Sequence, residues 1–291
     1  MHLLWYLILS AFFVPLILGF FATAVWGRMY QPADQPGGIV FHLVNNTSRW
    51  GVSYYPVNKF EKFIEILHRK GIVSRTLAES ARIKESDKNS HLPLFCITFD
   101  DGFEDFYHYV LPVLEKFNVK VTLFPIVSYI GTTAAWDVFP SRAHLSKAQL
   151  REIADKGHEI GSHSLTHPDL TMLNQRDLER ELTESRLILE DIIGRKVISL
   201  SFPYGRWNSR VWNTARHSGY SIASLYGRQR KLGNNIFPMK GAYAFDSVDR
   251  LVEKAENSLF NSPTTAQAVI MPHFAKGSTV WKFRKEYEFF H

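Results

Sequence analysis

Two adjacent carboxylates, Asp100 and Asp101, follow a short apolar run and precede a glycine in the segment CITFDDG of residues 96–102. The apolar run predicts a buried strand, and Gly102 permits the sharp turn after it. The acids therefore lie at the carboxyl end of a strand, the edge at which α/β folds bind ligands. Like charges this close normally need a cation or a shared proton between them, so the pair indicates a metal site. The alternative is that one acid caps a helix starting near Glu104 while the other is solvated.

Two histidines, His163 and His167, lie four residues apart in the segment GHEIGSHSLTHPDL of residues 157–170. Side chains at i and i+4 share one face of a helical turn, so we expect both imidazoles to point the same way. Two imidazoles and one carboxylate leave coordination positions open for water and substrate, which is typical of a catalytic metal site rather than a closed structural one. A His-x-x-x-His pair alone also fits a surface coincidence, and the neighbouring AspAsp pair favours the metal interpretation.

Two further strand ends carry polar groups. The segment VISLSFPYG at 197–205 runs from an apolar stretch into a turn that presents Tyr204, and the segment AVIMPHF at 268–274 delivers His273. If these strands are parallel to the other two, their ends line one mouth of the fold. His273 also fits a loop histidine near the chain end.

Together these segments resemble the polysaccharide deacetylases of the NodB-homology type, also called carbohydrate esterase family four. Residues 98–102 match the ThrPheAspAspGly signature of that family, and residues 163–167 match its His-Ser/Thr-x-x-His signature. PheProTyrGly at 202–205 matches most of its third motif. Weaker likenesses are ValPheHisLeuVal at 40–44, similar to the opening strand, and ValThrLeuPheProIleVal at 121–127, similar to the second barrel strand.

The resemblance implies a distorted (β/α) barrel, an α/β fold, that removes acetyl groups from N-acetylated sugars with a divalent metal, usually zinc. It implies that Asp101, His163 and His167 hold the metal and that Asp100 is the general base. The backbone N–H of Tyr204 would help to hold the oxyanion. Amide hydrolysis needs a hydroxide at neutral pH and a stabiliser for the oxyanion, and a bound divalent ion supplies both.

The chain also departs from the family pattern. His273 resembles the histidine of the family's Leu-x-His motif, which protonates the departing amine, but here the preceding residues are Met and Pro. Ser201 stands where the family often has an Arg that hydrogen-bonds the base, although branches acting on poly-N-acetylglucosamine also lack it. Lys240 stands near the position of another family Arg and fits either a supplier of positive charge or a solvated surface lysine.

The amino terminus is the second strong signal, because residues 3–26 contain no charged side chain. This length is about that of a membrane-spanning helix. We expect residues 1–27 to be an uncleaved single-pass anchor, with a cleaved signal sequence at AlaThrAla of residues 22–24 and secretion as the alternative. Residues 28–38 then form a linker, and residues 39–291 form one deacetylase domain whose catalytic part lies outside the cytoplasmic membrane.

The composition agrees with one α/β domain behind that segment. A 45% hydrophobic content supplies a core, and the formal charge of +6 is a modest excess without a basic patch interleaved with aromatics, which argues against nucleic-acid binding. The single cysteine, Cys96, lies in an apolar strand, so we expect a buried core thiol. Trp136 and Trp207 fit core packing or stacking on a sugar near the site.

Three functions account for these patterns. The first is a membrane-anchored, metal-dependent deacetylase of an N-acetylated glycan such as poly-N-acetylglucosamine or peptidoglycan. The second is an amidohydrolase acting on a small or lipid-linked N-acyl compound, since the same chemistry serves it. The third is a glycan-binding relative that has lost turnover, which the intact acids and histidines argue against.

Overall fold

The structure is a computed structural model of the 291-residue chain and describes residues 37–46, 53–86, 95–136, 139–226 and 235–259. The strands are β1 (Gly37–Phe41), β2 (Leu43–Asn45), β3 (Tyr54–Pro56), β4 (Ser74–Arg75), β5 (Phe95–Asp101), β6 (Thr122–Pro125), β7 (Thr133–Trp136), β8 (Phe139–Ala143), β9 (Glu159–Ile160), β10 (Ser199–Ser201), β11 (Ile222–Tyr226) and β12 (Ile236–Gly241). The α-helices are α2 (Val57–Arg69), α3 (Leu77–Ser86), α4 (Leu111–Lys116), α5 (Lys147–Asp155), α6 (Gln175–Ile193), α7 (Ser209–His217) and α8 (Val248–Leu259). A π-helical turn, η1 (Phe106–Val110), and two 3-10 turns, η2 (Val127–Tyr129) and η3 (Pro203–Gly205), complete the elements.

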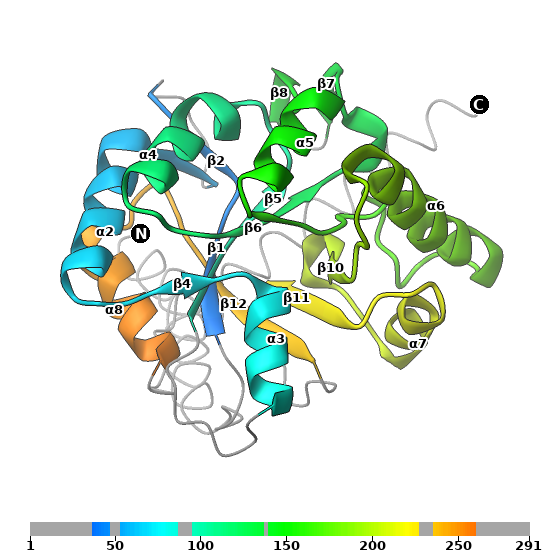
Figure 1. Ribbon diagram of the computed structural model, residues 1–291. Coiled ribbons are helices and arrows are strands. Elements are labelled where there is room, and N and C mark those ends of the chain that lie inside the picture. Colours follow the sequence, from blue (N-terminus) through cyan, green and yellow to red (C-terminus); the bar gives the residue numbers. More distant parts are fainter. Residues whose placement is uncertain (1–36, 47–52, 87–94, 137–138, 227–234, 260–291) are drawn as a thin grey trace, which may run out of the picture.

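Seven parallel strands form a ring in the order β10-β11-β12-β1-β5-β6-β9, with short β4 pairing beside β5. A parallel bridge between Ser162 and Leu200 joins the residues after β9 to β10. It consists of the Ser162 amide donating to the Ser199 carbonyl and the Ser201 amide donating to the Ser162 carbonyl, both over 2.9 Å. The expected barrel of parallel strands surrounded by helices is therefore confirmed (Figure 1).

Strand β5 shows why this sequence forms a barrel strand. All seven of its residues are buried, because one face packs against the outer helices while the other faces the barrel interior. On the outer face, the Phe99 ring lies 5.4 Å from that of Phe41, 5.8 Å from that of Phe60 on α2 and 4.9 Å from that of Phe106 on η1. These contacts fix the strand whose carboxyl end carries Asp100 and Asp101.

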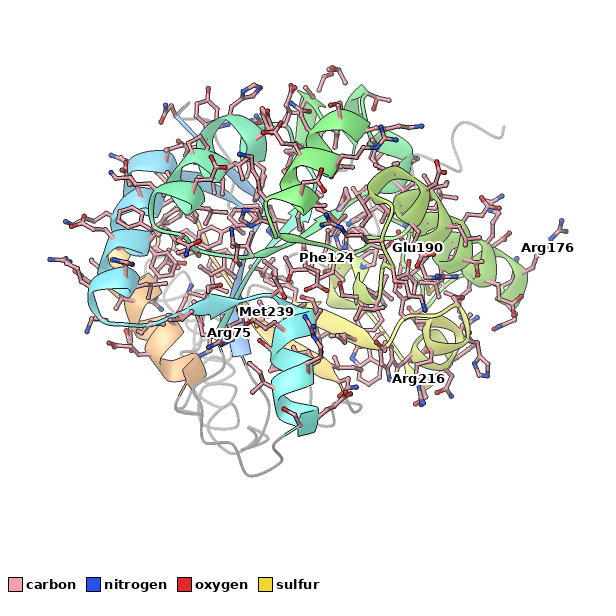
Figure 2. All side chains as sticks on the ribbon, viewed as in Figure 1. Arg75, Phe124, Arg176, Glu190, Arg216 and Met239 are labelled. Carbon is pink, nitrogen blue, oxygen red and sulfur yellow. The ribbon has the colours of Figure 1, made fainter. Side chains whose placement is uncertain are left out.

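The barrel interior is filled by a smaller apolar cluster that includes Cys96, Phe124 and Met239, and Figure 2 shows the latter two at the centre of the molecule. Leu77 and Ala81 of α3 belong to this cluster, so α3 closes the end of the barrel at which the strands begin. Cys96 is 1% exposed, and burial raises the pKa of its thiol to about 12. The expectation of a buried core thiol is confirmed.

Two helices expected from the sequence are present. The pattern over residues 56–71 gives α2, and the pattern over 177–194 gives α6, which begins after the cap Asn174 and ends at Gly194 with a left-handed φ of 65°. None of the helices in the described ranges is long and apolar enough to cross a membrane. The expected anchor or signal segment, residues 1–27, lies outside those ranges.

Candidate active site

Asp100 and Asp101 are the last two residues of β5, and both are buried, with 3% and 1% of their surface exposed. Side chains alternate along a strand, so two successive acids would normally point to opposite faces. Asp101 escapes this alternation because its φ is 73°, and Gly102 continues the turn with a φ of 74°. A Cβ at Gly102 would lie 2.7 Å from that of Pro125, so a glycine is required there.

His163 and His167 come from the loop after β9, and the helical turn expected from their spacing is wrong. Left-handed backbone at Ser164 (φ 66°) and His167 (φ 63°) folds the loop instead. The Ser162 hydroxyl accepts from the Ser164 amide over 3.1 Å, and the Ser164 hydroxyl accepts from the His167 amide over 3.0 Å. The two imidazole rings nevertheless meet, with centroids 4.7 Å apart.

A buried carboxylate on α6, Glu181, holds the same loop from outside. It is 3% exposed and accepts the backbone amides of Leu165 and Thr166, each over 2.9 Å, and the Thr166 hydroxyl over 2.6 Å. These bonds satisfy a charge that would be costly to bury unpaired. Glu181 therefore fixes the loop between the two histidines, a role that the sequence did not indicate.

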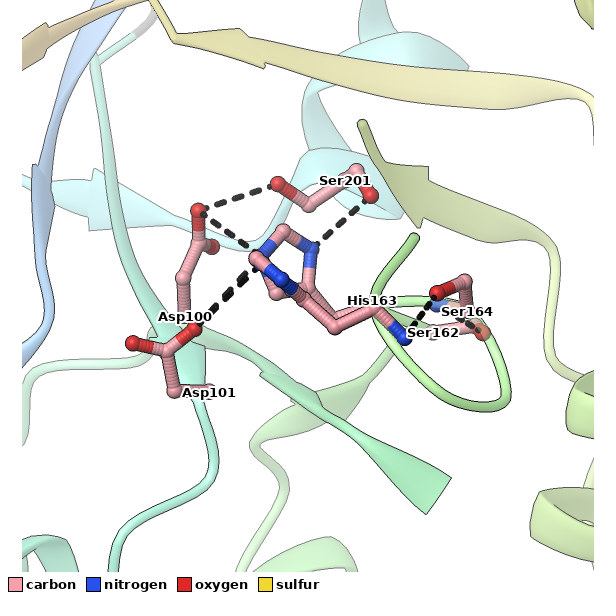
Figure 3. A network of polar contacts seen from close by, with 7 residues as sticks. Asp100, Asp101, Ser162, His163, Ser164 and Ser201 are labelled. Carbon is pink, nitrogen blue, oxygen red and sulfur yellow. Dashed lines mark hydrogen bonds and ion pairs between the residues drawn. The ribbon is translucent and has the colours of Figure 1, made fainter. Parts of the chain in front are cut away.

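The expected ligand set converges. One ligand atom each of Asp101, His163 and His167 lies within 4.8 Å of the others, and all three residues are buried. Oδ1 of Asp101 is 3.6 Å from Nε2 of His163 and 4.0 Å from Nε2 of His167 (Figure 3). Two imidazole nitrogens and one carboxylate oxygen are the donors of a catalytic zinc-type site, so the residues present fit a divalent ion.

The orientation of His163 supports this fit. Its Nδ1 lies 2.9 Å from the carbonyl of Ser201, and because a carbonyl only accepts, Nδ1 carries the proton and Nε2 keeps its lone pair. Burial lowers the pKa of His163 to about 3, so the ring is neutral at pH 7. A neutral imidazole whose free nitrogen faces Asp101 is the form that binds a metal.

Asp100, the residue expected to act as the base, lies beside this ligand set. Its Oδ2 accepts a hydrogen bond from the Ser201 hydroxyl over 3.0 Å and lies 4.0 Å from Nε2 of His163. Burial raises the pKa of Asp100 to about 7, with the Ser201 bond acting in the opposite direction. A carboxylate with a pKa near neutrality can accept a proton from water and release it again. Ser201, where the family often has Arg, thus contacts the acid directly.

Tyr204 lies beside the ligands, with its ring 4.6 Å from that of His167. It adopts a left-handed conformation with φ 58° in the turn η3, and the next residue, Gly205, packs so closely that a Cβ there would lie 2.2 Å from the Tyr226 carbonyl oxygen. Arg206 continues this turn and pairs with buried Asp169, two residues after His167, over 2.5 Å. This ion pair ties the histidine loop to the Tyr204 turn.

His42 is a residue of this mouth that the sequence analysis missed. It follows β1 directly, and because Phe41 pairs with Phe99 in the parallel register, His42 lies level with Asp100 on the neighbouring strand. Its ring contacts that of Tyr226 edge-on at 6.1 Å. Burial lowers the pKa of His42 to about 4, and a charge on His42 would in turn lower the pKa of His163. His42 is recognised only through the pairing of Phe41 with Phe99, which lie 58 residues apart in the sequence, and no local sequence pattern indicates that pairing.

The other expected site residues have separate outcomes. His273 lies outside the described residues, as does the side chain of Trp136. Trp207 is half-buried and stacks on Phe202 at 5.9 Å, which favours core packing. Lys240 donates to the carbonyl of Lys254 on α8 over 3.2 Å, so its described contact is with that helix.

The fold and site define an α/β-barrel hydrolase with a candidate metal centre at the carboxyl ends of its strands. The family model described as "Polysaccharide deacetylase" matches residues 87–223. Over these residues the chain is similar to the polysaccharide deacetylase family, and the resemblance drawn from its motifs is confirmed.

Two curated relatives and one solved structure illustrate the similarity. YxkH of Bacillus subtilis (strain 168), which carries the family's name, is 28% identical over 200 residues, covering 69% of this chain and 67% of YxkH. The chitooligosaccharide deacetylase of Sinorhizobium fredii is 33% identical over 129 residues, covering 44% of this chain and only 54% of that protein. The Streptococcus pyogenes deacetylase PplD, solved with acetate, has the same fold with a TM-score of 0.66 at 19% identity, covering 77% of this chain and 99% of PplD.

Proposed function

We propose that this protein hydrolyses the N-acetyl groups of an N-acetylated glycan in a metal-dependent reaction. The observation that carries the proposal is the convergence of Asp101, His163 and His167 within 4.8 Å beside the buried carboxyl of Asp100. A ligand triad next to a base with a pKa near 7 is what amide hydrolysis by an activated water requires.

We assign a separate role in this reaction to each of the site residues. Asp101, His163 and His167 would hold a divalent ion, with zinc the best match to the donor set. When bound, such an ion lowers the pKa of water and polarises the acyl oxygen. Asp100 takes the proton from the attacking water, whose oxygen adds to the carbonyl carbon of the acetamide. The Tyr204 ring lies next to that of His167, and we assign its backbone N–H the role of donor to the developing oxyanion.

Breaking the C–N bond releases acetate and an amine, and the nitrogen must gain a proton as it leaves. We propose His42 for this role, because it sits level with Asp100 on the adjacent strand. Its imidazole is neutral at pH 7, so it must first take up a proton from solvent, and a negatively charged intermediate beside it favours that uptake. The amine nitrogen then receives this proton as the C–N bond breaks, and His42 returns to its neutral form. His273 remains the second candidate, on the strength of its sequence motif alone.

The substrate is proposed from chemistry and from the relatives. A related protein of Sinorhizobium fredii is named as a chitooligosaccharide deacetylase. Because chitooligosaccharides consist of N-acetylglucosamine units, this name supports such a unit as the carrier of the scissile amide. A glycan such as poly-N-acetylglucosamine or peptidoglycan presents the same group. A small or lipid-linked N-acyl compound is the second candidate, because the catalytic residues recognise the amide rather than the glycan.

The test is acetate release from N-acetylglucosamine oligomers and from peptidoglycan by the purified full-length chain, with and without a chelator, alongside metal analysis. Release that stops on chelation and returns with zinc supports the proposal. Bound metal without release from either glycan points to a different N-acyl substrate. A protein that binds oligomers but holds no metal and releases no acetate would be a non-catalytic relative.

Placement outside the cytoplasmic membrane is also proposed, and it rests on the apolar residues 3–26 alone. Glycans of the cell envelope lie on that side, which is where such an enzyme would act. Protease digestion of intact spheroplasts tests this placement: the folded domain should be accessible from outside. Protection of the domain until the membrane is lysed would contradict it.

A further inference from the structure

The loop between β12 and α8 reaches the same edge of the barrel as the catalytic acids. It runs from the end of β12 at Gly241 to the start of α8 at Val248. Strand order places β12 next to β1 and β1 next to β5, so β12 lies two strands, or about 10 Å, from the strand that carries Asp100. In barrels of this kind, the loops at this edge bind substrate.

A fully buried acid, Asp246, anchors this loop. Its Oδ2 accepts the backbone amide of Tyr243 over 2.9 Å and pairs with Nζ of Lys254 over 2.5 Å. Its Oδ1 lies 3.4 Å from Nε of Arg250, and its own amide donates to the Tyr243 carbonyl. Both cations come from α8, so a buried ion-pair network ties the loop to the helix behind it.

The anchored loop presents an aromatic ring to solvent. Phe245 is 55% exposed and stacks on Tyr243, with ring centroids 5.4 Å apart and planes 14° from parallel. Tyr243 itself is 5% exposed, and Nζ of Lys254 lies 4.7 Å from the centre of its ring. Among the side chains that the structure describes, Phe245 is the only exposed Phe, Tyr or Trp.

A row of rings connects this pair to the catalytic residues. The hydroxyl of Tyr243 lies 2.6 Å from that of Tyr226, the last residue of β11. Tyr226 in turn contacts His42 edge-on. Burial raises the pKa of Tyr226, and the charge of Asp100 is a smaller cause in the same direction. The Phe245–Tyr243 stack is therefore continuous with the mouth of the site and is not an isolated surface feature.

Single exposed apolar residues are common on proteins and need no function. The others described here, Val73, Met172, Leu187 and Ile188, are aliphatic. Phe245 differs in being a flat ring on an anchored loop beside a proposed glycan site. The C–H faces of a pyranose are apolar, and a rigid aromatic face binds them at little entropic cost.

We propose that Phe245, supported by Tyr243, is a stacking platform for a sugar ring of the glycan chain next to the unit being deacetylated. This inference rests on the proposed function, and it adds a subsite that favours oligomeric substrates over a single sugar. Because β12 lies two strand spacings from the strand of the base, we assign a ring stacked on Phe245 to a neighbouring unit of the glycan chain.

The test measures acetate release and direct binding of N-acetylglucosamine oligomers of increasing length, using the full-length chain. Phe245→Ala should raise KM and Kd for long oligomers about 3- to 10-fold, with a smaller effect on short ones. Phe245→Trp keeps a flat ring and should retain oligomer affinity. Leu187→Ala, which removes a residue of similar exposure from α6, should match the wild type at every length.

The outcomes separate the subsite from the activity. If the wild type releases acetate but Phe245→Ala has unchanged KM and Kd at all lengths, the platform is overturned and the activity stands. If no acetate is released but calorimetric binding of long oligomers still depends on Phe245, the proposed reaction fails and the platform stands. An equal loss at every length in a variant with wild-type thermal stability would also overturn the subsite.

Discussion

The hydroxyl of Ser201 donates a hydrogen bond to Oδ2 of Asp100 over 3.0 Å, while the carbonyl of the same serine accepts from Nδ1 of His163. One residue of β10 thus orients both the candidate base on β5 and a candidate metal ligand on the loop after β9. The bridge that closes the barrel between Ser162 and Leu200 is adjacent, so closure of the fold and alignment of the site depend on the same backbone.

The two contacts of Ser201 predict that Ser201→Ala lowers turnover about tenfold while metal stays bound. The backbone carbonyl that orients His163 remains, but the base loses a hydrogen bond of the kind worth about 1.5–3 kcal/mol when one partner is charged. Turnover and metal content measured on the same preparations check this. Ser201→Thr keeps the hydroxyl and should retain most activity; equal activity of the Ala and Thr variants would show that the bond is not needed.

Asp101 and Asp100 are adjacent, but substituting them should have different effects on metal binding and turnover. Asp101→Ala removes the carboxylate that faces both imidazoles, so we expect loss of metal and of acetate release together. Asp100→Asn keeps the side-chain shape and should retain metal while turnover falls at least 100-fold, the usual contribution of a general base. Full metal occupancy and turnover in Asp101→Ala would make the ligand assignment wrong.

The position of the acids could be predicted from the sequence because it depends on local signals. An apolar run followed by AspAspGly fixes a strand, its end and the turn, and β5 ends at Asp101 as expected. The convergence of His163 and His167 was also predicted, but through the wrong local structure. Their loop depends on left-handed backbone and on Glu181, which lies 16 residues after Leu165 on another element. Residue spacing does not report such a distant contact.

His42 and Phe245 could not be found in this way. The role proposed for the first depends on the pairing of β1 with β5, and the role proposed for the second depends on β12 lying beside β1. Both relationships are set by the order of strands around the ring. A sequence indicates which segments are strands through periodicity and composition, whereas neighbours in a parallel sheet follow from the whole topology.

Glu181 should support metal binding without touching the metal. Glu181→Ala leaves two part-buried backbone amides and the Thr166 hydroxyl without their acceptor, which costs at most about 1–3 kcal/mol per group and frees the loop between the histidines. We expect zinc affinity to fall at least tenfold, measured by competition with a chromogenic chelator. Glu184→Ala, an exposed acid one turn along α6, is the matched control. Equal zinc affinity in both variants would contradict the role.

The proton donor can be assigned by comparing two histidines. If His42 protonates the departing amine, His42→Asn should lower turnover 10²- to 10⁴-fold with metal retained, while His273→Asn changes it little. Rate constants for acetate release across pH, with metal content as the control, distinguish the two. Unchanged turnover in His42→Asn together with a large loss in His273→Asn would transfer the role to the carboxyl-terminal segment.

The burial of His158 predicts how the free energy of unfolding depends on pH. It is 4% exposed beside Phe106, and burial lowers its pKa from 6.5 to about 4. The unfolded chain therefore takes up a proton near pH 6.5, whereas the folded chain resists it until about pH 4. The contribution to the free energy of unfolding is complete above pH 6.5 and is lost as pH falls between these values.

For this one histidine, the linkage gives a loss of roughly 2 kcal/mol between pH 7 and pH 5. Urea unfolding at both pH values should show that the wild type loses roughly that much more stability than His158→Gln, which cannot titrate. Comparing the two proteins cancels the contribution of His42, which changes in the same direction. His217→Gln, which alters an exposed histidine on α7, should follow the wild type. Parallel losses in the wild type and His158→Gln would mean that His158 is as readily protonated in the folded chain as in the unfolded one.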